Sequence, residues 1–217
     1  YSMAFLGGQS FHCCAGFLAF LLALVCMEPF GRKRMSKPAL SDFARIVSVY
    51  YLLMIFDEMI SPASDYFMVL MVFFIIIRWL ELIEEKETSC YPFAALCIFC
   101  LVVLTVKLSG ALILLLALKP TAMLIKERQF KEMAKYIGVG VMTILPFLIR
   151  NVILSGWLVY PLTFIDIFSF DFKIPKGMAD YDAREIQVWG RGIKDVGRYG
   201  EKVAAWLPQW AEGLDGS

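Results

Sequence analysis

The sequence has 217 residues, of which 59% are hydrophobic and only 19% are charged, and its mean hydropathy is +0.67. A soluble globular domain carries about 25% charged residues, so this composition indicates a membrane protein. The formal net charge is +1, and the sequence shows no basic patch with interleaved aromatic residues of the kind that binds nucleic acid. We therefore expect membrane lipids, and no nucleic acid, among the partners.

Apolar segments divide the chain into six predicted membrane spans, near residues 11–27, 43–60, 66–83, 92–106, 108–125 and 136–154. About 20 helical residues cross the ~30 Å hydrocarbon core of a bilayer. The second and fifth segments have short uncharged centres and reach that length only by extending beyond them. Pro146 lies in the last segment and favours a kink there. We predict an all-α, polytopic helical membrane protein whose membrane domain covers residues 1–159.

Basic residues predict the orientation of these spans. The loops after the first, third and fifth spans, with their flanks, contain twelve lysines and arginines, whereas the alternate short loops contain Lys107 alone. The twelve are Arg32, Lys33, Arg34, Lys37, Arg45, Arg78, Lys86, Lys119, Lys126, Arg128, Lys131 and Lys135. Since cytoplasmic loops are rich in lysine and arginine, we expect residues 57–65, Lys107 and everything after residue 154 to lie outside the bacterial cytoplasmic membrane. The chain begins at Tyr1, so we expect a fragment of a longer protein.

The segment from residue 160 to residue 217 is more polar and is predicted to be an extracytoplasmic tail. Residues 168–175 alternate like an extended strand, and residues 194–210 place Val196, Tyr199, Val203, Trp206 and other apolar residues at near-helical spacing. An amphipathic helix of this kind lies on the outer membrane interface or packs on the membrane domain. The sequence leaves both interpretations open.

Two of the six cysteines, Cys97 and Cys100, have the CxxC spacing of some redox and metal sites. They fall inside a predicted span that has no histidine and no second cysteine pair. Small packing residues are the favoured interpretation. We therefore predict no redox cofactor and no metal site formed by the protein alone, and leave open a divalent cation that would bridge a bound phosphate.

Five ionisable residues lie at the predicted outer ends of the spans: His12, Asp57, Glu58, Lys107 and Arg150. A charged side chain at the centre of a spanning helix costs roughly 2.5 to 3.5 kcal/mol on insertion, so each ionisable residue within a span needs a structural or functional explanation. In one interpretation, Lys107 or Arg150 neutralises Asp57 or Glu58 at the water boundary. In the other, Lys107 and Arg150 bind a lipid phosphate, which the fork of an arginine suits well. Asp57 would then be a catalytic carboxylate, with His12 and Glu58 in support.

Several motifs add a resemblance to a known family. They are Thr105-Val-Lys-Leu-Ser-Gly110, the segment 145–161 with Arg150-Asn151 and Ser155-Gly-Trp-Leu-Val-Tyr160-Pro161, Asp171-Phe-Lys-Ile-Pro175 and Trp189-Gly-Arg191. Their combination resembles a family of bacterial multi-spanning proteins similar in layout to the GT-C glycosyltransferases. The resemblance implies transfer of a sugar from a polyprenyl phosphate carrier to a cell-surface glycan or lipid.

The same resemblance also limits the assignment of catalytic residues. GT-C enzymes carry their decisive acidic residue in the first large external loop, which would precede Tyr1, so no catalytic residue is transferred from the family. The alternative is a transporter, or a lipid-handling or scaffold component without chemistry. In a transporter, the short segments around Lys107 and the proline-containing last span would be discontinuous helices along a substrate path.

Overall fold

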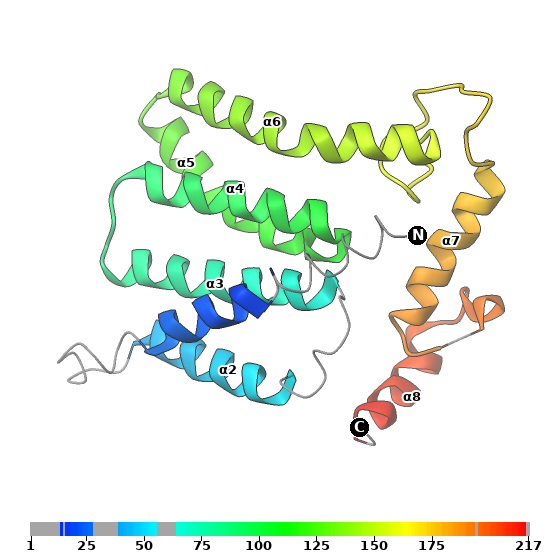
Figure 1. Ribbon diagram of the computed structural model, residues 1–217, viewed down its shortest axis with the longest axis horizontal. Coiled ribbons are helices and arrows are strands. Elements are labelled where there is room, and N and C mark those ends of the chain that lie inside the picture. Colours follow the sequence, from blue (N-terminus) through cyan, green and yellow to red (C-terminus); the bar gives the residue numbers. More distant parts are fainter. Residues whose placement is uncertain (1–13, 15, 28–38, 56–63, 194, 216–217) are drawn as a thin grey trace. The chain divides into compact units, whose positions relative to one another are not determined.

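The computed structural model describes residues 14, 16–27, 39–55, 64–193 and 195–215 (Figure 1). Within these residues all regular structure is helical and no β-strand forms, which confirms the all-α prediction. The packing of the chain divides it into two compact units, Tyr1–Ile144 and Leu145–Ser217, which we describe separately. This division falls inside a helix. The predicted boundary near residue 159 concerns the end of the membrane domain and not the packing of the chain, and it stays a prediction.

The helices of the first unit follow the predicted apolar segments. They are the helix Gly16–Met27, α2 (Leu40–Ile55), α3 (Ser64–Glu84), α4 (Cys90–Val106), the 3-10 helix η1 (Leu108–Ala117), α5 (Leu118–Lys126) and the first part of α6 (Phe130–Ser155). Three stretches, Asp65–Glu84, Leu108–Lys126 and Phe130–Ser155, are long and apolar enough to cross a membrane. The membrane class is supported by these three helices, and the count of six spans stays a prediction.

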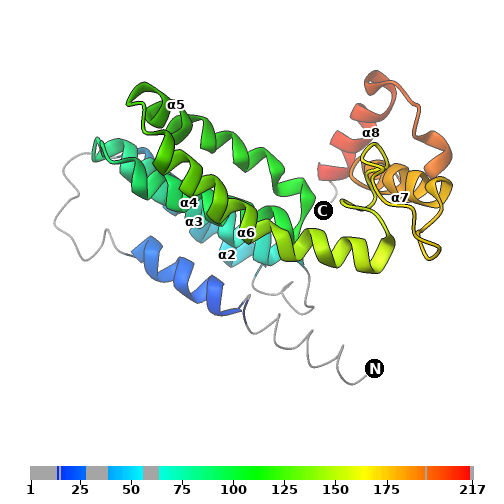
Figure 2. The same ribbon diagram turned by 90° about the horizontal axis from the view of Figure 1, so that it is seen from above.

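Helix α3 is the centre of the first unit and packs against α2 and α4 (Figures 1 and 2). Three apolar clusters connect it to its neighbours. Leu22 and Cys26 meet Leu70 and Ile77; Met71 and Ile75 meet Cys100 and Val103; and Trp79 meets Phe93 and Leu96. Cys100 is fully buried in the second cluster, Cys97 packs beside the third, and both are free thiols. In this structure, both cysteines of the CxxC pair pack among apolar side chains.

A tight turn at Lys107 reverses the chain between α4 and η1 (Figure 2). Lys107 has extended backbone angles, φ −151° and ψ 125°, and its N–H donates to the carbonyl of Val103. Gly110 then packs so closely that a Cβ atom there would lie 2.6 Å from Cγ1 of Val103. Ten 3-10 residues and nine α-helical residues span about 33 Å, so η1 and α5 together reach membrane length despite the short apolar centre.

A charged cluster joins α2 to α3. Arg45, which the sequence places in a basic loop, is only 8% exposed. It donates to Asp42 at 2.9 Å and to Glu81, and the backbone N–H and hydroxyl of Ser41 both donate to Glu84, at 2.8 and 2.6 Å. A buried arginine is tolerated because carboxylates of the same cluster pair with it.

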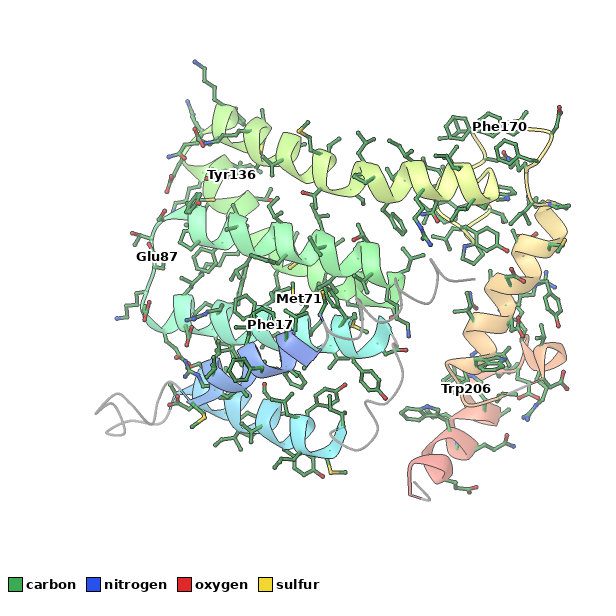
Figure 3. The ribbon with its side chains drawn as sticks, viewed as in Figure 1. Phe17, Met71, Glu87, Tyr136, Phe170 and Trp206 are labelled. Carbon is green, nitrogen blue, oxygen red and sulfur yellow. The ribbon has the colours of Figure 1, made fainter. Side chains whose placement is uncertain are left out.

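The second unit contains the end of α6, an irregular segment, α7 (Lys176–Trp189), the 3-10 helix η2 (Val196–Arg198) and α8 (Val203–Asp215). The predicted helix at residues 194–210 is divided in the structure, because Asp195 accepts from the N–H of Gly197 and caps η2, and the following residues form a turn. Arg191 lies 5.2 Å from the ring centre of Trp206 and so connects the end of α7 to α8 (Figure 3).

Two features of the second unit differ from the sequence pattern. No strand forms at residues 168–175, because residues 171 and 172 form a turn and no neighbouring strand pairs with the segment within the part of the chain that the structure describes. Helix α7 is more polar than the helices of the first unit and buries only Ala179 and Val188, so it did not stand out as an apolar segment of the sequence. Helix α6 remains helical on both sides of Pro146.

Candidate functional site

The structure describes two of the five predicted site residues. Lys107 lies in the first unit and Arg150 in the second. His12, Asp57 and Glu58 lie outside the described residues, so their predicted roles stay predictions. No two of the predicted site residues are paired with each other in the described part of the chain.

Lys107 forms an ion pair with Asp65. Asp65 is in the first turn of α3 and Lys107 follows the last residue of α4, and these helix ends meet because α3 and α4 are packed neighbours. The side chains are 38% and 55% exposed, and an exposed pair of this kind contributes only about 0 to 1 kcal/mol. The sequence held a signal for this pair, since the predicted topology places both residues on the same side of the membrane.

Arg150 is exposed, and its side chain has no ion pair or hydrogen bond within the residues that the structure describes. It lies five residues before Ser155, the last residue of α6. The next residue, Asn151, has a buried side-chain amide nitrogen without a hydrogen-bond partner in the same described part. Of these two donors, the exposed guanidinium of Arg150 is accessible to a ligand and the buried amide nitrogen of Asn151 is not. A cation here also compensates the partial negative charge of the helix C-terminus, which is a purely structural role.

The polypeptide after α6 forms a loop whose two ends meet, which we call the closed loop (residues 157–173). The indole nitrogen of Trp157 donates to the carbonyl of Ile174 at 2.9 Å, and the N–H of Ile174 donates to the carbonyl of Ser155 at the same distance. Trp157 is only 1% exposed. The hydroxyl of Ser155 donates to the carbonyl of Asn151 at 2.7 Å. The loop thus begins and ends at the last turn of α6.

Lys173 holds the base of the closed loop. Its ammonium nitrogen lies 3.9 Å from the ring centre of Trp157, donates to the carbonyl of Phe168 at 2.6 Å, and forms an ion pair with Asp166. Gly156 has φ +75°, and a Cβ atom there would lie 2.8 Å from the Cα of Lys173. Only glycine combines this backbone angle with this approach. The charge of Lys173 is thus already satisfied within the loop.

Two further contacts attach the closed loop to α7. The phenol of Tyr160 donates to Asp182, and the hydroxyl of Thr163 donates to Asp180. Burial, and then the hydrogen bond to the Asp182 carboxylate, raise the pKa of Tyr160 from 10.0 to about 12. These groups form no fixed spacing in the sequence, so their contacts were not predicted. The only signal was the motif Ser155-Gly-Trp-Leu-Val-Tyr160-Pro161, which identified the segment and not its contacts.

Among the described residues, no group of three or more histidine, cysteine, aspartate or glutamate side chains could hold a metal ion. The divalent cation that would bridge a bound phosphate stays a prediction.

Three helices among the described residues are long and apolar enough to cross a membrane, which supports the class of α-helical membrane proteins. The chain belongs to the family described as Domain of unknown function (DUF8201), whose match covers residues 1–217. Comparison with curated proteins found no match, and comparison with solved structures found none either.

Proposed function

We propose that this protein binds a lipid phosphate at Arg150, as part of a GT-C-like glycosyltransferase that moves a sugar from a polyprenyl phosphate carrier to a cell-surface glycan or lipid. The observation that supports it is the exposed guanidinium of Arg150, which has no partner in the described residues and lies near the end of an apolar helix. A phosphate accepts hydrogen bonds from a guanidinium, whereas neutral acyl chains need no such donor.

The proposed reaction is a displacement at the anomeric carbon of the donor sugar. The acceptor hydroxyl forms the new bond, the bond between that carbon and the phosphate oxygen breaks, and the lipid phosphate leaves with the electron pair. A carboxylate, with Asp57 as the proposed residue, takes the proton of the acceptor hydroxyl. Arg150, and Lys107 as a second proposed phosphate contact, stabilise the charge that develops on the leaving group.

Native mass spectrometry of the protein extracted gently from a bacterial membrane tests the lipid site. The unchanged chain is compared with Arg150→Ala and with Lys131→Ala, which removes an exposed cation from the other end of the same helix. We expect a polyprenyl phosphate to remain on the unchanged chain and on Lys131→Ala, and to be lost from Arg150→Ala. Equal retention of bulk phospholipid by all three would make Arg150 an interfacial anchor and refute the site.

Turnover tests the enzyme itself. In the full-length protein, Arg150→Ala should reduce use of the polyprenyl-linked donor while membrane insertion stays intact. Unchanged turnover in that variant would remove Arg150 from the mechanism.

A lipid-handling or transport function is the second candidate, and one observation favours it. The ten-residue 3-10 helix η1 is longer than such helices usually are, and long 3-10 stretches often mark hinges. This function requires bound lipid without any turnover of a sugar donor, so the two assays together separate the candidates.

A further inference from the structure

We infer that the part of the closed loop between residues 162 and 172, which we call the aromatic loop, inserts its apolar side chains into the interfacial layer of the lipid bilayer. Five large apolar residues of this short segment are exposed: Leu162, Phe164, Ile167, Phe170 and Phe172. Phe164 is 77% exposed and Phe172 is 59% exposed. Single exposed apolar residues are common on protein surfaces, whereas a cluster of them marks an interaction surface.

The rings in this loop are ordered relative to one another. Phe168 and Phe170 stack with ring centres 5.4 Å apart, and Phe170 and Phe172 stack with centres 5.1 Å apart and planes only 9° from parallel (Figure 3). The carbonyl of Phe170 accepts a hydrogen bond from the N–H of Lys173 at 3.0 Å, so residues 171 and 172 form a turn that brings Phe172 next to Phe170. The alternating aromatic residues thus form a ring stack at a turn in place of a paired strand.

The base of the loop is firmly attached, so the exposure of the rings is a property of the fold. Trp157 and Ile174 close the loop through the indole bond, and Tyr160 and Thr163 attach it to α7. Lys173 and Asp166 neutralise each other. This pairing lowers the cost of bringing the loop close to hydrocarbon, since an unpaired charge there is expensive.

The connection to α6 identifies the bilayer as the partner. At the two ends of the closed loop, the N–H groups of Trp157 and Ile174 both donate to Ser155, the last residue of α6. Helix α6 is long and apolar enough to span a membrane. Only 11% of the most apolar stretch of α6 is buried inside the protein. Ile149, Ile153 and Leu154, near the end of this helix, are exposed. A loop that starts and finishes where a span ends lies at the depth of the lipid headgroups. Aromatic and apolar residues on a polar base are favoured at this depth.

This inference depends on α6 as a membrane span and does not depend on glycosyl transfer. It would bring lipid headgroups to the same helix end that carries Arg150, whichever function the protein has. The two contacts are tested separately: the bilayer contact at residues 164 and 172, and the phosphate contact at Arg150. Either contact can be refuted without the other.

Photo-crosslinking to lipid tests the contact. The full chain, with p-benzoylphenylalanine in place of one residue, is reconstituted in bilayers of phosphatidylethanolamine and phosphatidylglycerol, irradiated and analysed by mass spectrometry. The probe replaces Phe164 or Phe172 in the aromatic loop, or Ile186 on α7, which is 61% exposed and so matches Phe172. A fourth variant, at Ile149, reports lipid contact of α6 itself. Circular dichroism confirms that each variant is folded.

We expect lipid adducts at positions 149, 164 and 172, with at least a tenfold lower yield at position 186. Equal lipid yields at Phe172 and Ile186 would overturn the inference, because exposure alone would then explain crosslinking. Adducts to a second copy of the chain at positions 164 and 172, without lipid adducts, would overturn it in favour of a protein contact. Lipid adducts at position 149 alone would refute the loop contact and leave α6 as a span.

Discussion

Alanine in place of Gly110 should destabilise the turn that connects α4 to η1. A Cβ atom at this position would lie 2.6 Å from Cγ1 of Val103, closer than real Cβ contacts come. Val103 is fully buried among Met71, Ile75 and Cys100. Its β-branched side chain has little rotamer freedom in a helix, so Cγ1 cannot rotate away cheaply. The backbone of η1 must therefore shift away from α4.

The magnitude follows from overpacking in a dense apolar core. One inserted methyl group in a well-packed site costs about 1 to 3 kcal/mol of unfolding free energy. Gly138→Ala is the matched control, because a Cβ atom at this position in α6 has no heavy atom within 4 Å. Alanine there should be neutral or stabilise the helix by up to about 1 kcal/mol.

Unfolding in mixed micelles, followed by far-ultraviolet circular dichroism as the fraction of sodium dodecyl sulfate rises, measures the free energy of each variant. Val103→Ala removes the clashing methyl groups, so the double variant with Gly110→Ala should be more stable than the sum of the single changes predicts, by about 1 kcal/mol or more. Strictly additive effects, or a Gly110→Ala variant as stable as the unchanged chain, would refute the close contact between η1 and α4.

Two further predictions concern charged and titrating groups. Arg45→Ala should cost about 1 to 3 kcal/mol, because Glu81, 15% exposed, loses its partner from α2 but keeps its ion pair with Arg78. A double-mutant cycle of Arg45 and Glu81 in the same micelle assay should show coupling between the two, and a cycle with no coupling would contradict a buried pair. The pKa of Tyr160 is about 12 in the folded protein and 10.0 for an unperturbed tyrosine, which stands for the unfolded chain. Folding therefore favours the protonated phenol, so the contribution of Tyr160 to stability should be complete below pH 10 and be lost as the pH rises from 10 to 12. The phenolate absorbance of the unchanged chain minus that of Tyr160→Phe reports this titration. Asp182→Asn should lower the midpoint of the titration, while burial keeps the midpoint above pH 10.0. An unchanged midpoint would exclude the hydrogen bond to Asp182 as a cause of the raised pKa.

Local sequence features predicted most of the helices. Apolar runs of sufficient length determine where helices form in a membrane, because every backbone polar group must be satisfied within its own segment. The positions of α3, α4 and α6 therefore followed from hydropathy alone. The turn at Lys107 was also visible, since Lys107-Leu-Ser-Gly110 interrupts two apolar runs. The prediction of an all-α protein needed no information about contacts between segments.

Contacts between distant residues were decided only by the tertiary structure. Asp65 and Lys107 are 42 residues apart in the sequence. The predicted topology showed only which carboxylates lie on the same side of the membrane as Lys107. Asp57 or Glu58 was therefore predicted as its counter-ion, and the structure pairs it with Asp65. Arg45 looked like a loop residue because its burial depends on Glu81, which is on another helix.

The second unit depends even more on long-range contacts. Trp157, Asp166 and Lys173 close a loop through contacts that no short motif encodes. The amino-acid sequence by itself determined the membrane class and the positions of the apolar helices, since these depend on composition and spacing along one segment. Only the tertiary structure decided which charges are paired, which basic side chain stays available, and which aromatic rings remain exposed, because each of these depends on residues that folding brings together.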